Sequence, residues 1–191
     1  MTEREAYLRR IFGGHFRETP VEALEMRLSC QKILHCLNAS SPEDFELREE
    51  CFRKLFGGWD PSVHIEPPFF CDAGKNIFIG VGTFINYGCT ILDTAKVSIG
   101  KRCWIAPNVQ IYAATHPVDA FERQKVCLAK PVSIGDDVWL GGSVIVCPGV
   151  SIGERAVIGA GSVVTRDIPS DCVAFGNPCR VHRALSPSRS E

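Results

Sequence analysis

The sequence has few of the features that would place a protein in a membrane or outside the cell. Its opening residues, MTEREAYLRRIFGG, carry too much charge for a secretory signal peptide. No apolar run approaches the roughly 18 residues that are needed to cross a bilayer. We therefore expect a soluble, cytoplasmic protein with no membrane partner.

A surplus of basic charge is also absent. The 191 residues carry a formal net charge of −1, and the 23% that are charged form neither a basic stripe nor an acidic tail. This balance gives no reason to expect a nucleic-acid partner. The length suits one domain, or one domain with an appendage, and allows a sizeable core.

The cysteines lack the spacing of a known site. There are ten of them, and no two are arranged as C-x-x-C, the pattern of many zinc and redox sites. Several, including Cys89 and Cys147, stand where valine or alanine would serve. We predict reduced, mostly buried thiols that act as small apolar side chains, and no metal ion.

Residues 1–60 have the periodicity of helices. After Pro20, the spacing of Val21, Leu24, Leu28 and Leu34 predicts a first helix. A second is expected to open near residue 41.

At that second helix, Ser41 can cap the start, Pro42 suits the first turn, and the acidic Glu43 and Asp44 suit the positive end of the helix dipole. Gly57–Gly58 is expected to end it. Its predicted apolar face consists of Phe45, Phe52, Leu55 and Phe56.

From about residue 61 the period changes to six. An aliphatic residue recurs at Ile134, Leu140, Val146, Ile152, Ile158 and Val164. Four of these are followed by glycine, namely Gly135, Gly141, Gly153 and Gly159. An earlier stretch has the same period, with one slip of two residues, at Ile79, Ile85, Ile91, Ile99, Ile105 and Ile111.

This period indicates a solenoid of short strands. Six residues turn an α-helix through about 600°, so the aliphatic residues would not share a helix face. A hexad instead fits one short strand with its aliphatic side chain inward and glycine allowing a bend at the corner. Three hexads then make one triangular coil, and coils stack. The predicted pairs are Ile134 on Ile152, Leu140 on Ile158, and Val146 on Val164.

The repeat stops at residues 112–131, where His116 appears. A regular wall offers no pocket, so a break is expected where a substrate is enclosed. A neutral imidazole with a pKa near ~6.5 can accept a proton at near-neutral pH, which makes a histidine at such a break a candidate functional residue. We therefore predict an excursion loop that carries a functional histidine.

The tandem pattern [LIV]-G-x-x-x-x resembles that of the hexapeptide-repeat acyltransferases. The segments FINYGCTILD, THPVD and WLGGSVIVCPGVSIG are similar to the maltose and galactoside O-acetyltransferase branch, and the likeness covers nearly the whole chain. The resemblance implies a mainly β fold, a left-handed parallel β-helix at residues 61–179 with the loop at 112–131. It also implies an N-terminal helical segment, 1–60, that contributes to the acceptor pocket, and a C-terminal tail, 180–191.

The resemblance further implies an acetyl-CoA-dependent O-acetyltransferase. Transfer would be direct, with His116 as general base. The small-molecule acceptor stays open between a sugar such as maltose, glucose or a galactoside and a non-sugar alcohol such as a secondary metabolite. The family forms homotrimers with a site between two subunits, so His116 of one chain would face Trp139 of the next.

Site residues are carried over from the family by motif. The expected acceptor-binding residues are Glu18, Asn86 and Asp93. The expected coenzyme A residues are Trp139, Gly142, Ala160, Thr165, Arg166, Arg180 and Arg183. Among these, the amide of Gly142 would meet the developing oxyanion and arginine would bind phosphate.

Three of these positions depart from the family pattern. Glu18 replaces an aspartate of galactoside acetylators, Gly142 stands where close relatives often have serine, and Arg166 stands where lysine is frequent. The first departure bears on the identity of the acceptor rather than on the chemistry.

Two other functions use the same fold. A zinc lyase of the carbonic anhydrase type needs three converging histidines, and only His116 lies within the clear coils. A non-catalytic β-helix would serve as an assembly or binding module. Loss of thiol release when His116 is removed would separate the transferase from this module.

Overall fold

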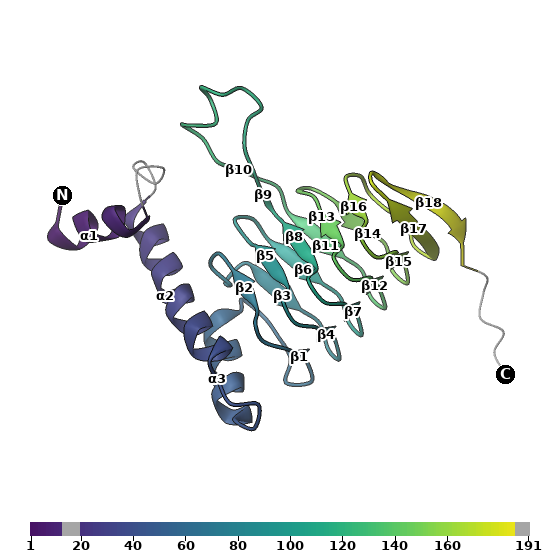
Figure 1. Ribbon diagram of the computed structural model, residues 1–191, viewed down its shortest axis with the longest axis horizontal. Coiled ribbons are helices and arrows are strands. Elements are labelled where there is room, and N and C mark those ends of the chain that lie inside the picture. Colours follow the sequence, from purple (N-terminus) through teal and green to yellow (C-terminus); the bar gives the residue numbers. More distant parts are fainter. Residues whose placement is uncertain (13–19, 186–191) are drawn as a thin grey trace.

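Three helices precede a stack of short strands in the residues that the structure describes, which are 1–12 and 20–185 of a computed structural model (Figure 1). The helices are α1 (Glu3–Phe12), α2 (Val21–Asn38) and α3 (Phe45–Leu55). Glu18 lies outside the described residues. None of the described helices is both long enough and apolar enough to cross a membrane.

The strands are short, and their bounds follow the hexads. They are β1 (His64–Ile65), β2 (Phe70–Cys71), β3 (Ile77–Ile79), β4 (Phe84–Ile85), β5 (Thr90–Leu92), β6 (Val97–Ile99), β7 (Trp104–Ile105), β8 (Gln110–Tyr112), β9 (Ala114–Thr115), β10 (Leu128–Ala129), β11 (Val132–Ile134), β12 (Trp139–Leu140), β13 (Ile145–Val146), β14 (Ser151–Ile152), β15 (Val157–Ile158), β16 (Val163–Val164), β17 (Cys172–Gly176) and β18 (Cys179–Ala184).

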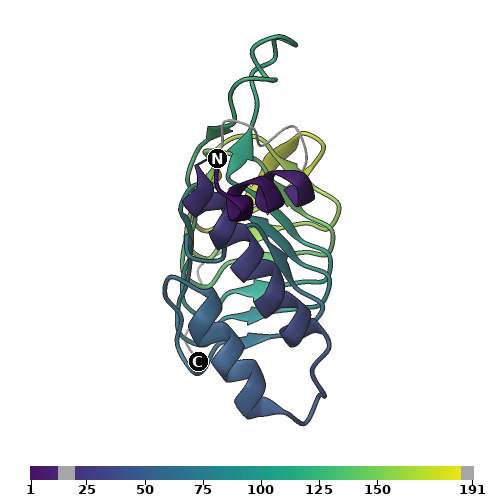
Figure 2. The ribbon, with the colours of Figure 1, turned by 90° about the vertical axis from the view of Figure 1, so that its left-hand side faces the viewer.

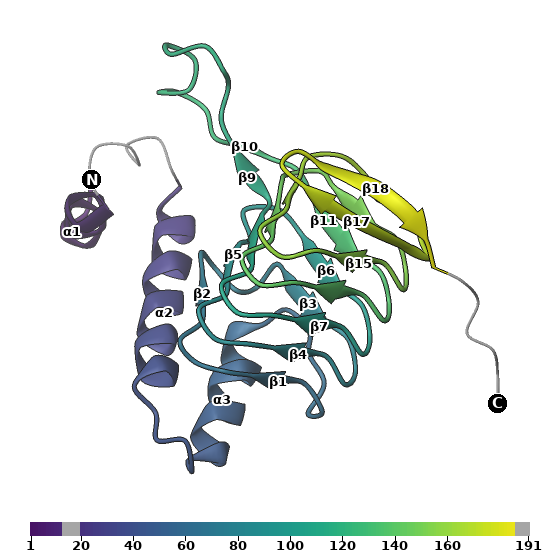
Figure 3. The same ribbon diagram turned by 45° about the vertical axis from the view of Figure 1, so that its right-hand side comes forward.

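Three sheets, parallel except at β18, form the walls of a solenoid (Figure 3). The first wall has the order β1-β4-β7-β12-β15-β17-β18, the second β3-β6-β11-β14, and the third β2-β5-β8-β13-β16. The chain passes from the first wall to the third and then to the second, and each coil adds one strand to each. This architecture confirms the predicted parallel β-helix with an N-terminal helical segment.

The predicted register is confirmed in each wall. Ile134 lies opposite Ile152, Leu140 opposite Ile158, and Val146 opposite Val164. All six side chains are buried in a core that runs the length of the solenoid. Burial of each such side chain contributes roughly 1.5–3 kcal/mol, so the period of six supplies a large apolar core.

The glycines after the aliphatic residues have a different role from the predicted one. A Cβ atom at Gly141 would lie 2.6 Å from the amide nitrogen of Ala160, and one at Gly153 would lie 2.4 Å from that of Ser170. Neither glycine has a left-handed backbone. They therefore allow successive coils to approach closely, and the left-handed φ angles occur at other corner residues, including Asp137 and Arg155.

The coils are not equal in length. Along the first coils, partners such as Thr83 and Cys103 are 20 residues apart, whereas Ser133 and Ser151 are 18 apart. The two extra residues belong to the corners between the third and second walls. This longer corner is the cause of the slip by two residues in the sequence pattern.

The helices α2 and α3 lie side by side at the N-terminal end of the solenoid (Figure 2). The predicted start of α3 is wrong, because Asp44 is its N-cap and accepts from the N–H of Leu47 at 3.1 Å. Ser41 lies outside the helix. Phe45 is 70% exposed and does not belong to the buried face, whereas Phe52 is buried with Leu55 and Phe56.

The C-terminal end of the solenoid is closed by a hairpin. β18 pairs antiparallel with β17, so the predicted tail from residue 180 begins inside a strand. The boundary is therefore corrected to the end of β18 at Ala184. A regular hexad pattern cannot signal this reversal, because β18 does not continue the period.

All ten cysteines are free thiols, and six of them are buried. Cys89 is one of these, and burial raises the pKa of its thiol to about 11. At that pKa the thiol stays protonated and serves as a small apolar side chain in the core.

Candidate active site

The break in the repeat forms an arm that protrudes from the solenoid (Figure 1). After β8, the strands β9 and β10 pair antiparallel as a narrow ribbon, and the repeat resumes at Val132 in β11. The arm is the segment 116–127 between these strands. The expected excursion at 112–131 is thus present, and His116 is the first residue of the arm.

The His116 ring is exposed and held at one nitrogen. Its Nδ1 lies 3.4 Å from the carbonyl oxygen of Val126, on the returning side of the arm. A carbonyl can only accept, so this contact favours the tautomer with the proton on Nδ1. In that tautomer Nε2 carries the lone pair and is the ring nitrogen that can accept a proton.

Arg27 and Asp72 form a charged pair that the sequence did not reveal. Burial raises the pKa of the Cys127 thiol at the end of the arm, and the negative charge of Asp72 adds to the effect. The Asp72 carboxylate accepts from Nη1 of Arg27 at 2.6 Å. Arg27 lies three residues from both Leu24 and Cys30 on α2. A basic residue at this spacing from apolar residues is the sequence feature that could have revealed it.

Asp93 has a different role from the predicted one. It is fully buried, and its carboxylate accepts from the amides of Asp72, Ala73 and Asn76 at 2.9–3.2 Å. These amides belong to the longer corner of the preceding coil. With its oxygens occupied by backbone donors, Asp93 stabilises that corner and does not face an acceptor.

Asn86 lies at a different corner of the prism from His116. It follows β4, where the first wall meets the third, and its Oδ1 accepts from the amide of Tyr87 at 2.8 Å. Gly142 and Ala160 follow β12 and β15 at this same corner, and the amide of Gly161 donates to the carbonyl of Gly142 at 2.9 Å. We call it the Asn86 corner.

Thr165 and Arg166 follow β16, at the corner where the third wall meets the second. This corner also carries Asp93 and the arm, and we call it the arm corner. Within one chain, the predicted site residues at the Asn86 corner are therefore apart from those at the arm corner, because the two corners lie at opposite edges of the third wall.

An aromatic ladder runs along the outside of the first wall. His64 pairs with Phe84, Phe84 with Trp104, and Trp104 with Trp139, and the first two ring pairs have centroids 5.5 and 5.8 Å apart. Trp104 and Trp139 are 63% and 54% exposed and border a recess of about 380 Å³. Trp104 was missed, although it precedes a repeat isoleucine just as Trp139 precedes Leu140.

The predicted coenzyme A residues lie at the C-terminal coils. Trp139, Gly142, Ala160, Arg180 and Arg183 belong to the first wall or to its edge at the Asn86 corner. Arg180 and Arg183 are exposed and donate to the backbone carbonyls of Cys179 and Ala184. Neither forms an ion pair with a carboxylate of residues 1–12 or 20–185. Guanidinium groups in this state are suited to phosphate.

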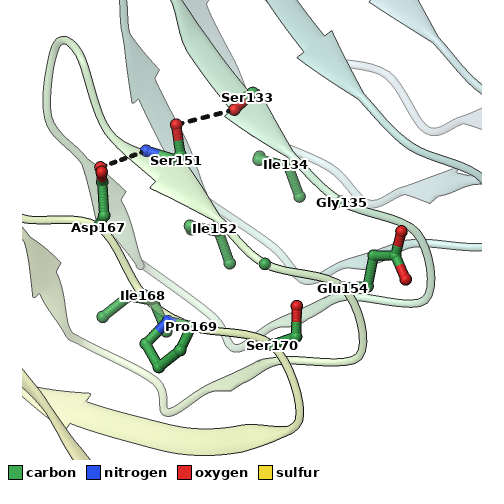
Figure 4. Close-up of a pocket in the computed structure, with 11 residues that line it drawn as sticks. Ser133, Ile134, Gly135, Ser151, Ile152, Glu154, Asp167, Ile168, Pro169 and Ser170 are labelled. Carbon is green, nitrogen blue, oxygen red and sulfur yellow. Dashed lines mark hydrogen bonds between the residues drawn. The ribbon is translucent and has the colours of Figure 1, made fainter.

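A larger hollow of about 760 Å³ lies on the second wall (Figure 4). Ser133 Oγ donates to Ser151 Oγ at 3.1 Å, and Asp167 accepts from the amide of Ser151 at 2.8 Å. None of the predicted site residues lines it. It forms where the wall ends, because Ile168 makes only a single bridge to Ile152.

Within the described part of the chain, no three His, Cys, Asp or Glu side chains are grouped so that they could hold a metal ion. A parallel β-helix of hexads, broken once by an arm that begins with histidine, has the architecture of the hexapeptide-repeat acyltransferases.

Comparison with known proteins identifies the family more closely. Residues 131–166 match the family model described as hexapeptide repeat of succinyl-transferase. The galactoside O-acetyltransferase of Escherichia coli K12 is 39% identical over 179 residues, which cover 93% of this chain and 88% of that protein. The chain belongs to the galactoside and maltose O-acetyltransferase family and is an acetyl-CoA-dependent acetyltransferase.

Solved structures agree with this assignment. A maltose O-acetyltransferase from Clostridium difficile 630 is 43% identical with a TM-score of 0.85, and the match covers 97% of this chain and 98% of that one. A hexapeptide-repeat acetyltransferase from Vibrio cholerae, complexed with acetyl coenzyme A, is 37% identical with a TM-score of 0.83, covering 97% and 100%. The zinc lyase finds no support among these relatives.

Proposed function

We propose that this protein acetylates a hydroxyl group of a sugar of the maltose, glucose or galactoside type, with His116 as the general base. The observation that carries the proposal is the position of the His116 ring. It lies at the base of the arm, exposed, with Nδ1 facing the Val126 carbonyl and Nε2 available to accept a proton. The alternative acceptor is a non-sugar alcohol, which the same chemistry would serve.

The reaction follows from these groups. Nε2 of His116 removes the proton of the acceptor hydroxyl as its oxygen attacks the thioester carbonyl carbon. The new C–O bond forms, the C–S bond breaks, and the proton passes from the imidazolium to the departing sulfur. The thiol of coenzyme A and the acetyl ester are the products, with no covalent intermediate on the enzyme.

The backbone at the Asn86 corner is suited to the developing negative charge. The amide of Gly142 has no hydrogen-bond acceptor assigned to it among the described residues, and nothing but the Pro107 carbonyl oxygen lies within 4 Å of where its Cβ would stand. A small, open residue with an available N–H can donate to an oxyanion. Coenzyme A would contact Trp139, Gly142, Ala160, Thr165, Arg166, Arg180 and Arg183.

The acceptor would be bound next to the N-terminal coils. The amide NH₂ of Asn86 can donate to a hydroxyl, since its Oδ1 is already occupied by the amide of Tyr87. Helix α2, fixed to the solenoid by the Arg27–Asp72 ion pair, would form part of the pocket near the arm. Glu18 would reach the acceptor from the segment before α2.

A homotrimer would unite the two corners. Within one chain His116 belongs to the arm corner and Gly142 to the Asn86 corner, so a second copy is needed to bring the base to the oxyanion donor. The apolar side chains of the arm support such a contact, because Val118 is 95% and Phe121 77% exposed. In a closed ring, His116 of one chain would face Trp139 of its neighbour.

The first test is acetyl-CoA-dependent thiol release against paired panels of sugars and non-sugar alcohols. We expect a sugar to stimulate release, and His116→Ala to lower the rate by roughly 10²-fold or more, as removal of a general base does. His35→Ala is the matched control, since His35 is exposed on α2. Stimulation by non-sugar alcohols alone would show that the acceptor is the alternative one. Full activity of His116→Ala would overturn the role of His116 as general base.

Subunit mixing tests the shared site. His116→Ala and Trp139→Ala chains, each with little activity, are unfolded together, refolded, and compared with each variant refolded alone. If one site uses His116 of one chain and Trp139 of the next, mixed trimers contain some intact sites and regain activity. A mixture that forms trimers but stays as inactive as its parents would show that both side chains come from the same chain.

A further inference from the structure

We propose that Phe175, in the closing hairpin, is the stacking platform for the adenine ring of coenzyme A. The inference rests on the proposed function, because it assigns a further residue to the coenzyme A site. It gives the adenine ring a stacking partner, Phe175, that is not among the residues carried over from the family.

The Phe175 ring is exposed at the end of the β-helix where the predicted arginines lie. It is 47% exposed, and its direct cross-strand partner in β18 is Arg180. His182, two residues after Arg180 and therefore on the same face of the strand, has its ring centroid 4.8 Å from that of Phe175. An aromatic surface and a guanidinium group thus stand together on one face of the hairpin.

The hairpin holds this ring in a fixed position. A Cβ atom at Gly159 would lie 2.8 Å from the Cβ of Phe175, so the side chain starts directly over a glycine of the coil below. The buried Ser162 donates to the carbonyl of Gly159 at 2.5 Å and accepts from the amide of Gly176 at 3.1 Å. These contacts fix the ring next to Ala160, which follows Gly159 in the Asn86 corner.

The charges around the ring match an adenosine bisphosphate. Arg180 and Arg183 flank Phe175 on β18, and within the described ranges neither is paired with a carboxylate. By contrast, the nearby Arg155 is bound at 2.6 Å by Asp171. If the adenine of the nucleotide stacked on Phe175, the phosphates of the nucleotide would lie near the two arginines. An apolar protein surface as the partner of Phe175 would leave the charges of these arginines without a counterpart.

The test separates the nucleotide from the rest of the ligand. Acetyl-CoA is compared with acetyl-pantetheine, which carries the same thioester and lacks the nucleotide. For Phe175→Ala we expect the KM for acetyl-CoA to rise about tenfold with kcat within about twofold, a size typical of one lost base–aromatic contact. The kcat/KM for acetyl-pantetheine should not change. Phe175→Trp should restore the KM, and Phe175→Leu should not.

Direct binding gives a second readout that does not depend on turnover. Calorimetric titration with adenosine 3′,5′-bisphosphate should show about tenfold weaker binding to Phe175→Ala than to the wild-type protein. Phe45→Ala, which removes a 70% exposed ring from α3, is the matched control and should bind as the wild type does.

Three results would overturn the proposal. They are equal losses for acetyl-CoA and acetyl-pantetheine, unchanged affinity for adenosine 3′,5′-bisphosphate, or a change in oligomeric mass, which would assign the ring to a contact between copies. A wild-type protein that transfers acetyl to no acceptor would count against the proposed function, and the nucleotide titration would still decide the role of Phe175.

Discussion

The first coils and the last coils of the same solenoid differ in how they turn. Between β3 and β8 the chain uses 20 residues a coil, with the longer corner held by the buried carboxylate of Asp93. From β11 to β16 it uses 18, the last coil onto β17 uses 16, and stacked glycines bring the coils together. The longer coils carry the helices and Asn86, which is proposed to bind the acceptor, whereas the shorter coils carry Trp139, Gly142 and Ala160, which are proposed to contact coenzyme A.

This difference indicates where such a fold can vary. A strict hexad leaves few residues that are free of the core and the turn. Extra residues at a corner give a place for a helix to attach and for an acceptor to be distinguished. Matched substitutions in the longer coils and in the shorter coils should therefore change the stability of the protein by different amounts.

The largest effect is expected from the buried carboxylate. Asp93→Ala removes the acceptor of three amides and should lower the free energy of unfolding by about 4 kcal/mol, since each unpaired buried donor costs about 1–3 kcal/mol. Urea denaturation measures it. In the shorter coils, Asp167→Ala removes one acceptor at an exposed site and should cost less than about 1 kcal/mol. Equal losses would mean that the carboxylate does not hold the longer corner.

The close approach of the shorter coils is tested next. Gly141→Ala places a Cβ atom 2.6 Å from the Ala160 nitrogen, where only backbone can give way, and should cost about 2 kcal/mol. Its neighbour offers a control, because a Cβ at Gly142 meets nothing nearer than 3.6 Å. The two thermal unfolding midpoints should differ by several degrees. If Gly141→Ala is as stable as Gly142→Ala, the coils are less tightly stacked than the distances indicate.

A smaller effect is expected for the helix attachment. A double-mutant cycle on Arg27 and Asp72, with side chains 34% and 19% exposed, should give a coupling of about 1 kcal/mol. The same cycle on Arg155 and Asp171, each 50% exposed in the shorter coils, should give about 0.3 kcal/mol. A larger coupling in the exposed pair would reverse the contrast between the two ends.

The smallest effect concerns pH at the charged corner residues. Nη2 and Nε of Arg102 bind the carboxylate of Asp137 and hold its pKa below its usual range, and Arg155 does the same for Asp171. A depressed folded-state pKa gives stabilisation that is present above the unfolded pKa and is lost as the pH falls through the folded value.

Acid titration of the thermal midpoint measures this contribution. Between pH 6 and pH 3, the wild type should lose slightly more stability than Asp137→Asn, by well under 1 kcal/mol because the pair is exposed. High salt should shrink the difference. If Asp137→Asn loses more stability than the wild type over this pH range, the ion pair is not the source of the pH dependence.

The hexads predicted much of the fold because their signal is local and repeated. Each aliphatic residue reports one inward strand position, so the register of Leu140 on Ile158 followed directly from counting. The site was less predictable. His116 was found because it interrupts a period, whereas Arg27, Trp104 and Phe175 matter through neighbours that are distant in sequence. Asp93 was assigned wrongly, because a motif cannot tell whether a carboxylate faces solvent or the backbone of another coil.

The sequence by itself determined the parallel solenoid, its register and the position of the arm, because a period of six is compatible with little else. The acyltransferase class followed from the resemblance of segments such as THPVD to a known family. Only the tertiary structure decided that the repeat glycines serve close stacking, that the chain reverses at β18, and that the predicted site residues divide between two corners. These properties depend on distances between coils and between walls. Residues paired between neighbouring coils are 16 or more positions apart, and no local pattern encodes which atoms face each other.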